Sequence, residues 1–385
     1  MSTAIAFLSG KGGSGKTTLS LSMADLLCRC DMHILLVDCD LSTNGASYFY
    51  ESQLTAQNKN EQLKVLSFVD LINTTDYLDD RSPLEIKSAL DFIPSIPEIS
   101  GQYLVTEQTS QDSDKSFFLS KFIDWARDNY DVMLFDCQAG YTEILPMLLP
   151  LMDIDLFVLE ADSISASAMR SLHLKIGNYL GRARLYQIFN KATLEEFEIY
   201  SKIVGTFFTN IGTLQFDWKI RQAFSRSQIP DLENTSAKYG LDLCTICKII
   251  LTDKASQEKL GRFSAQQRYK QLVEKRKKTE EELYKLEVKQ RPEVKPKLVG
   301  SIYFIIGIIG MFLSIVLSTN DIIFPFGLST NTVFAILIFV GVIILFAQHL
   351  VNVSMESRTM RQKYERKLRD INKELEKMDY SRKKI

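Results

Sequence analysis

The residue types that could do chemistry begin with a glycine-rich stretch at residues 9–20, SGKGGSGKTTLS. Glycines in this spacing let consecutive backbone N–H groups point at phosphate oxygens at the start of a helix. We expect Lys16 to reach the β- and γ-phosphates and the Thr17 hydroxyl to bind Mg²⁺. The stretch therefore predicts a nucleotide site with contacts from Gly10, Lys11, Gly12, Gly13, Ser14, Gly15, Lys16, Thr17 and Thr18.

Three aspartates follow apolar runs that read as strands. Asp38 and Asp40 end the run HILLVDCD, and Asp136 ends DVMLFDC. Open parallel sheets bind ligands at the carboxyl ends of their strands, so we expect the three carboxylates beside the glycine-rich loop. Asp136 is the natural partner of Mg²⁺, and an aspartate after the second strand can orient an attacking water. An isolated aspartate at a strand end would more often cap a helix.

The elements that must position these residues alternate along the front half of the chain. Apolar runs such as TAIAFLS, HILLVDCD, DVMLFDC and DLFVLEAD are separated by helical patterns. Continuous apolar strands are typical of a parallel sheet covered by helices on both faces. We therefore predict an α/β domain with a mostly parallel sheet over residues 1–248.

These motifs together resemble a known family. KGGSGKTT, LLVDCD and DVMLFDCQAG are similar to the deviant Walker A ATPases, the ParA/MinD-like branch of the SIMIBI-class P-loop proteins. The segments LDFIPS, FNK at 189–191 and LQFDWKIRQAFSRSQIP at 214–230 extend the resemblance over about residues 1–245. The sequence departs from the family pattern after the second aspartate (DCDLSTN), in DCQAG, and at Ser14.

The resemblance implies a mechanism and a partner. It identifies Lys11 as the signature lysine, which crosses an ATP-sandwich homodimer to the phosphates of the other subunit, and Asp40 as the residue that assists hydrolysis to ADP. It places Asp38 with Thr17 and Asp136 in the Mg²⁺ and water network, and Asn190 against adenine. The implied catalytic residues are Lys11, Lys16 and Asp40. A cation that reaches the γ-phosphate only in the dimer would make ATP a switch for association, read by a protein partner.

The C-terminal part has a different composition. Residues 1–250 contain 21 Lys and Arg against 32 Asp and Glu, whereas residues 251–385 contain 25 against 15. The acidic front half argues against a DNA-coating surface, so no nucleic-acid partner is expected. Two uncharged apolar runs, 298–317 and 332–351, have the length of membrane-spanning helices and are joined by the short segment 318–331. With basic residues on both flanks, they predict a two-pass hairpin in the inner (cytoplasmic) membrane with both termini cytoplasmic.

Two segments beside this hairpin read as helices of a coiled coil. Residues 253–297 are rich in Lys, Glu, Gln and Leu, and residues 353–385 carry Tyr364, Leu368, Ile371, Leu375 and Met378 at a 4-3-4-3 spacing. The two helices could pair with each other as a stalk, or with copies in other subunits to form a higher oligomer.

The pair Cys244 and Cys247 could hold zinc across a dimer with the same pair from a second chain, or could be ordinary packed thiols. Two other functions are compatible with the sequence. One is a nucleotide-binding membrane scaffold with little turnover. The other is an enzyme of the bacterial tyrosine-kinase type, although the C-terminal end carries only Tyr364 and Tyr380 as candidate tyrosines.

Overall fold

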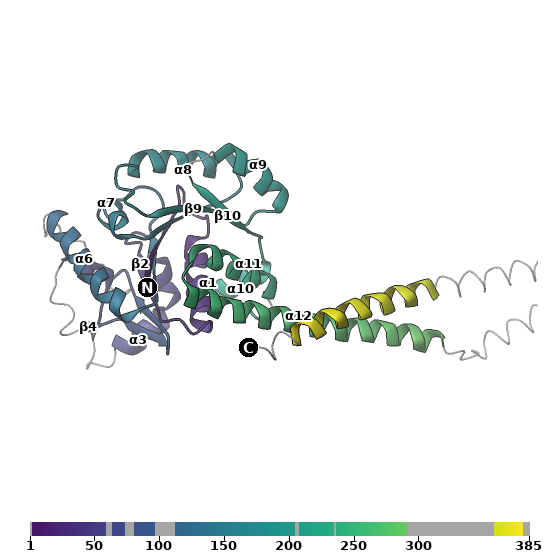
Figure 1. The fold of residues 1–385 in the computed structure, drawn as a ribbon. Helices are drawn as coiled ribbons and strands as arrows, with labels where there is room; N and C mark the ends of the chain where they lie inside the picture. The colour runs from purple at the N-terminus through teal and green to yellow at the C-terminus, as the bar shows by residue number, and fades with distance from the viewer. Residues whose placement is uncertain are drawn as a thin grey trace, which may run out of the picture. The chain divides into compact units, whose positions relative to one another are not determined.

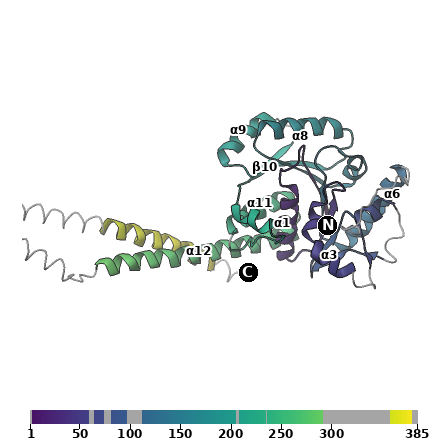
Figure 2. The same ribbon diagram turned by 180° about the vertical axis from the view of Figure 1, so that it is seen from behind.

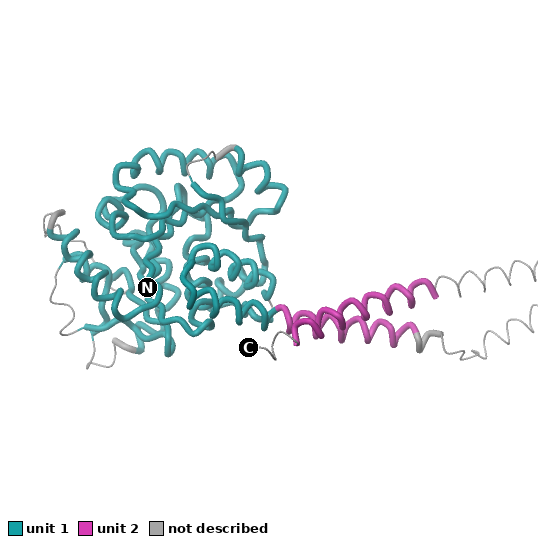
Figure 3. The backbone as a smooth tube through the Cα atoms, in the orientation of Figure 1, with its two compact units in different colours: residues 1–267 teal, residues 268–385 magenta. Residues whose placement is uncertain are grey.

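The computed structural model describes residues 2–58, 64–73, 81–96, 112–204, 208–234, 236–290 and 358–379. The chain forms two compact units, 1–267 and 268–385 (Figure 3). The first contains the glycine-rich loop and every candidate site residue.

A central sheet organises the first unit (Figures 1 and 2). In pairing order its described strands are β10 (Thr209–Leu214), β9 (Arg184–Asn190), β8 (Ile154–Leu159), β1 (Thr3–Leu8), β7 (Val132–Cys137), β2 (Ile34–Cys39), β6 (Leu90–Ile93) and β5 (Leu84–Lys87). Every neighbouring pair is parallel except β5 and β6. The short strands β3 (Lys64–Val65) and β4 (Arg81–Ser82) pair separately. The predicted mostly parallel α/β sheet is confirmed.

Helices cover both faces of this sheet, because successive side chains of each buried strand point to opposite faces. In β1, Ile5 and Phe7 enter one core, whereas Ala4, Ala6 and Leu8 enter the other. The first core is closed by α1 (Lys16–Arg29), α2 (Gly45–Phe49), α3 (Glu51–Asn58), α10 (Trp218–Phe224), α11 (Ala237–Ile250) and the start of α12 (Lys254–Gln290). The second is closed by α4 (Phe68–Asn73), α6 (Asp112–Asn129), α7 (Leu145–Leu148), the 3₁₀ turn η1 (Leu149–Leu151), α8 (Ser163–Ile176) and α9 (Leu194–Val204).

The compact first unit extends beyond α11 to residue 267. Leu260 and Phe263, in the first turns of α12, are buried in the first core. The beginning of this long helix is therefore part of the α/β unit.

The second unit contains the rest of α12 and a helix over residues 358–379. Thr279 is buried on α12, and Ile371 and Leu375 are buried on the other helix. A shallow pocket is lined from both helices, by Thr279 and Glu282 on one and by Tyr364 and Lys367 on the other. The two helices therefore lie side by side within this unit. The coiled-coil assignment over the full ranges 253–297 and 353–385 stays a prediction.

The predicted membrane hairpin is corrected. No helix among the described residues combines the length and the apolar character needed to cross a bilayer. The runs 298–317 and 332–351 and the segment 318–331, on which the prediction rested, lie outside the described residues. Run length, hydropathy and basic flanks supported that prediction, whereas the long helix that is described, α12, is rich in charged residues. The fold class is therefore an α/β domain followed by long helices, and the two-pass inner-membrane location is withdrawn.

Candidate nucleotide-binding site

The glycine-rich loop connects β1 to α1, as predicted. Gly13 and Gly15 have φ angles of +83° and +86°, a region that glycine adopts without steric cost. Lys16 is the first residue of α1 and is only 7% exposed. Backbone N–H groups at this end of a helix have no partner within the helix and attract anions.

A cavity of about 830 Å³ opens beside this loop. Its wall includes nine of the predicted site residues: Gly12, Gly13, Ser14, Gly15, Lys16, Thr17, Thr18, Asp40 and Asn190. Another part of the wall is aromatic and aliphatic, from Phe216, Ile220, Phe224 and Tyr239. The volume lies in the range of small-molecule sites. Cationic and N–H-rich walls suit phosphates, and ring-lined walls suit a flat base.

The strand-end aspartates Asp38 and Asp136 lie side by side, because β2 and β7 pair in parallel with these residues in register. Both are buried and neither lines the cavity. Burial and the negative charge of Asp136 raise the pKa of Asp38 to about 7. Asp38 is nevertheless fully hydrogen-bonded: Oδ2 accepts from Ser47 N (2.8 Å) and Ser47 Oγ (2.7 Å), and Oδ1 accepts from Asp40 N (3.0 Å).

Asp136 differs from Asp38 in its hydrogen bonding. Neither of its carboxylate oxygens has a hydrogen-bond partner of regular geometry in the described part of the chain. Burial raises the pKa of Asp136 to about 6, and the nearby Lys16 ammonium opposes that rise. Thr17 and Ser20 also lie close enough to lower the pKa, without meeting the geometry of a hydrogen bond. A buried carboxylate with unused oxygens next to a phosphate loop needs a cation or a bound water.

These residues fit Mg²⁺. Among the described residues, no three His, Cys, Asp or Glu side chains converge to form a metal site of their own. Mg²⁺ is commonly held by one or two protein oxygens together with substrate phosphates, which is what Thr17 and Asp136 can offer. Asp38 would influence the metal site indirectly and not as a ligand, because its oxygens already accept hydrogen bonds from Ser47 and Asp40.

Asp40 is oriented by its own loop. Its Oδ1 accepts from Ser42 N (3.0 Å) and Thr43 N (2.8 Å), and its Oδ2 accepts from Thr43 Oγ1 (2.6 Å). The residue also lines the cavity. Of the three aspartates, Asp40 is placed best to act on a water in the cavity.

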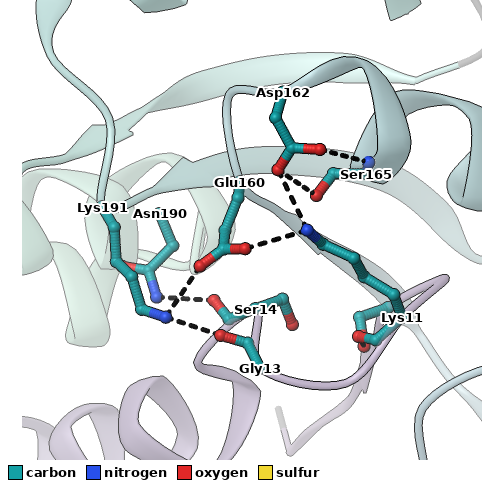
Figure 4. A network of polar contacts seen from close by, with 9 residues as sticks. Lys11, Gly13, Ser14, Glu160, Asp162, Ser165, Asn190 and Lys191 are labelled. Carbon is teal, nitrogen blue, oxygen red and sulfur yellow. Dashed lines mark hydrogen bonds and ion pairs between the residues drawn. The ribbon is translucent and has the colours of Figure 1, made fainter.

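Lys11 does not line the cavity of its own chain. Its Nζ lies 3.1 Å from Glu160 Oε2 and 3.0 Å from Asp162 Oδ2 (Figure 4). Glu160 directly follows β8, and Asp162 caps α8 by accepting from Ser165 N. Lys11 is therefore held on the turn between β8 and α8.

Asn190, at the end of β9, closes the other side of the loop. Its Nδ2 donates to Ser14 O (2.9 Å), and Lys191 Nζ donates to Gly13 O (2.5 Å) and lies 2.8 Å from Glu160 Oε1 (Figure 4). Two consecutive residues thus bind two consecutive loop carbonyls. Sequence reasoning identified Asn190 but missed Lys191, Glu160 and Asp162. Their strand-end positions, in FNK and LEAD, were the available signal.

Cys244 and Cys247 lie on α11 and are both buried in the first core. Cys244 Sγ donates to Leu260 O (3.5 Å). Burial raises the pKa of Cys247 well above its usual value, which disfavours the thiolate that zinc requires. Packed thiols are the better description of this pair.

Comparison with known proteins agrees with this geometry. A family model described as "AAA domain" matches residues 2–178, just under half of the chain. MinD from Pyrococcus horikoshii OT3, complexed with Mg-ADP, superposes with a TM-score of 0.51 at 18% identity, over 67% of this chain and 99% of that one. The fold is that of the ParA/MinD-like P-loop ATPases.

One further solved structure and one curated protein are similar to this chain. An ATP complex of McdA from Cyanothece superposes with a TM-score of 0.50 at 15% identity, over 65% of this chain and 96% of that one. A curated relative from Rhizobium rhizogenes, "Putative replication protein A", is 27% identical over 150 residues. That match spans 36% of this chain and only 35% of the relative, so it concerns a shared segment.

Proposed function

We propose that this chain binds ATP with Mg²⁺, hydrolyses it to ADP, and forms a homodimer through its ATP-bound α/β units. The observation that carries the proposal is the buried carboxylate of Asp136 on β7. It has no hydrogen-bond partner of regular geometry among the described residues, and it lies near Lys16 and Thr17 of α1. Mg²⁺ held by Thr17 and Asp136, together with nucleotide phosphates, would compensate the charge of this carboxylate. A protein partner that responds to the dimer completes the proposed switch.

The position of Lys11 supports the dimer. Its ammonium is directed to the β8–α8 turn and not into the cavity of its own chain. A lysine that served only its own nucleotide would be expected to line that cavity, as Lys16 does. Lys11 is therefore not used for the nucleotide of its own chain, which is consistent with a role in a second subunit.

Replacing Lys11 tests this role directly. Lys11→Ala should bind ATP about as tightly as the wild type, while ATP-dependent dimerisation and phosphate release are lost. Sedimentation velocity with ATP, ADP and no nucleotide measures the dimer, and a phosphate-release assay measures turnover. Lys202→Ala, at an exposed position on α9, is the matched control. A Lys11→Ala protein that still dimerises with ATP would contradict the proposal.

Asp40 is the proposed residue that activates water. Because Asp40 lines the cavity, Asp40→Ala should lower phosphate release about 100-fold or more while leaving the ATP-bound dimer intact. The dimer should then persist for longer after ATP is added, as followed by light scattering. Normal turnover in Asp40→Ala would remove Asp40 from the mechanism. ATP-dependent dimers of the wild type without phosphate release would favour a nucleotide-binding scaffold.

A further inference from the structure

Glu160 serves two lysines at once. Its Oε2 lies 3.1 Å from Lys11 Nζ, and its Oε1 lies 2.8 Å from Lys191 Nζ (Figure 4). Although burial alone would raise the pKa of Glu160, the ammonium groups of Lys191 and Lys11 hold it below its usual value. One carboxylate therefore connects the lysine expected to serve a second subunit with a lysine that contacts the phosphate loop.

The Lys191 contact stabilises the loop. Lys191 Nζ donates to the Gly13 carbonyl at 2.5 Å, next to the Asn190 contact with Ser14. Lys191 has a φ of +59°, an uncommon conformation for a side chain of this size. Glu160 restricts a flexible ammonium to one direction, and so lowers the entropy that is lost when Lys191 binds the loop carbonyl.

The contact of Glu160 with Lys11 opposes dimerisation. Glu160 and Asp162 together give this ammonium two carboxylate partners, and the hydrogen bond to Asp162 is the main cause of its raised pKa. To reach phosphates in another subunit, Lys11 must first leave both carboxylates. Both ion pairs are partly exposed to solvent, and such pairs are weak, so the restraint on Lys11 is modest and reversible.

We propose that Glu160 is a positioning residue that favours nucleotide binding and opposes dimerisation. It holds Lys191 on the phosphate loop, and it keeps Lys11 on its own chain until a second nucleotide-bound subunit competes for it. This inference rests on the proposed function, because it assigns the restraint to the lysine of the ATP-bound dimer.

The proposal predicts opposite effects from one substitution. Glu160→Gln removes the charge but keeps the shape of the side chain. It should raise the dissociation constant for ATP about threefold to fivefold, because Lys191 loses its anionic partner. At a saturating non-hydrolysable ATP analogue, it should lower the dissociation constant of the dimer by a similar factor. General damage to the fold would weaken both equilibria.

Two further variants separate the two contacts. Asp162→Asn keeps a good cap for α8. Of the two lysines, Asp162 contacts only Lys11, so this variant should tighten the dimer and leave ATP affinity unchanged. Lys191→Met should weaken ATP binding without tightening the dimer. Glu233→Gln is the matched control, because Glu233 also pairs with a half-exposed cation, Arg29, at the far end of α1.

Isothermal titration of the full chain with ATP gives the first equilibrium, and sedimentation equilibrium with the analogue gives the second. Opposite shifts in Glu160→Gln, with no shift in Glu233→Gln, support the proposal. A weakened or unchanged dimer in Glu160→Gln overturns it. If the wild type forms no dimer with the analogue, the proposed function itself has failed, which is a distinguishable result.

Discussion

At the scale of single residues, two buried carboxylates illustrate how location decides their use. Asp136 and Asp155 are both almost fully buried, and neither has a hydrogen-bond partner of regular geometry among the described residues. Asp136 lies beside Lys16 and the predicted Mg²⁺ position, so its charge can be compensated. Asp155 lies near the start of β8. Burial alone raises the pKa of Asp155 to about 7.

Asp155 should therefore destabilise the fold at neutral pH. The unfolded chain releases this proton near pH 3.8, whereas the folded chain keeps it until about pH 7. Below pH 3.8 the carboxyl is protonated in both states and does not lower the free energy of unfolding. As the pH rises from 3.8 to 7, the free energy of unfolding falls, by about 4 kcal/mol once the pH is above 7.

Asp155→Asn tests this cost. Its free energy of unfolding should equal that of the wild type near pH 4 and exceed it increasingly up to pH 8, by a few kcal/mol at most. Urea unfolding across this pH range measures the difference. Asp242→Asn, on the half-buried face of α11, is a comparison in which a smaller change is expected. A difference that did not grow with pH would contradict the assignment.

At the scale of elements, the start of the phosphate loop packs closely against the backbone of α8. A β-carbon at Gly10 would lie 2.3 Å from the backbone carbonyl carbon of Ala168, whereas one at Gly12 would meet no atom within 4 Å. Neither glycine has a positive φ, so the difference is purely one of space. Gly10 allows β1 and the start of the loop to lie against α8, which carries the Lys11 partner Asp162 at its cap.

Gly10→Ala should therefore destabilise the nucleotide-free protein by about 1–3 kcal/mol or more, because helix backbone cannot give way as a side chain could. Gly12→Ala is the matched control and should change the free energy of unfolding by less than about 0.5 kcal/mol. Denaturant unfolding without nucleotide compares the two. Equal effects of both substitutions would mean that α8 does not restrict the loop.

The parts of the site that the sequence predicted share a local origin. The spacing of Gly10, Lys16 and Thr17 is contained in one loop, and Asp38 and Asp136 follow from the rule that parallel strands end at one edge. The contact of Lys11 with Glu160 joins residues about 150 positions apart, and only the pairing of β1 with β8 brings them together. The strand-end positions of Glu160 and Lys191 can be read from the sequence, but no short pattern encodes their contacts, which is why both residues were missed.

At the scale of the whole molecule, the two units differ in how far the sequence predicted them. The α/β unit was predictable because buried parallel strands leave continuous apolar runs. The membrane hairpin rested on the length and hydropathy of two runs and on their basic flanks. It is corrected because no described helix is long and apolar enough to cross a bilayer. In the second unit, buried positions at residues 371 and 375 recur with helical spacing, and Thr279 is buried on α12. Among the residues of this unit that the structure describes, few apolar side chains are therefore buried.

The helix pair of the second unit should depend strongly on those few positions. Replacing both Ile371 and Leu375 by Ser removes most of the buried apolar surface of helix 358–379, so both this helix and α12 beyond residue 268 should exchange amide hydrogens faster. Hydrogen exchange with mass spectrometry localises the change, and exposed Lys373 and Glu376, replaced together by Ser, provide the control. Because Leu260 and Phe263 anchor the start of α12 in the other core, protection at 254–267 should be retained. Faster exchange confined to 358–379 would show that α12 is stable without its neighbour, and would contradict a pairing on which both helices depend.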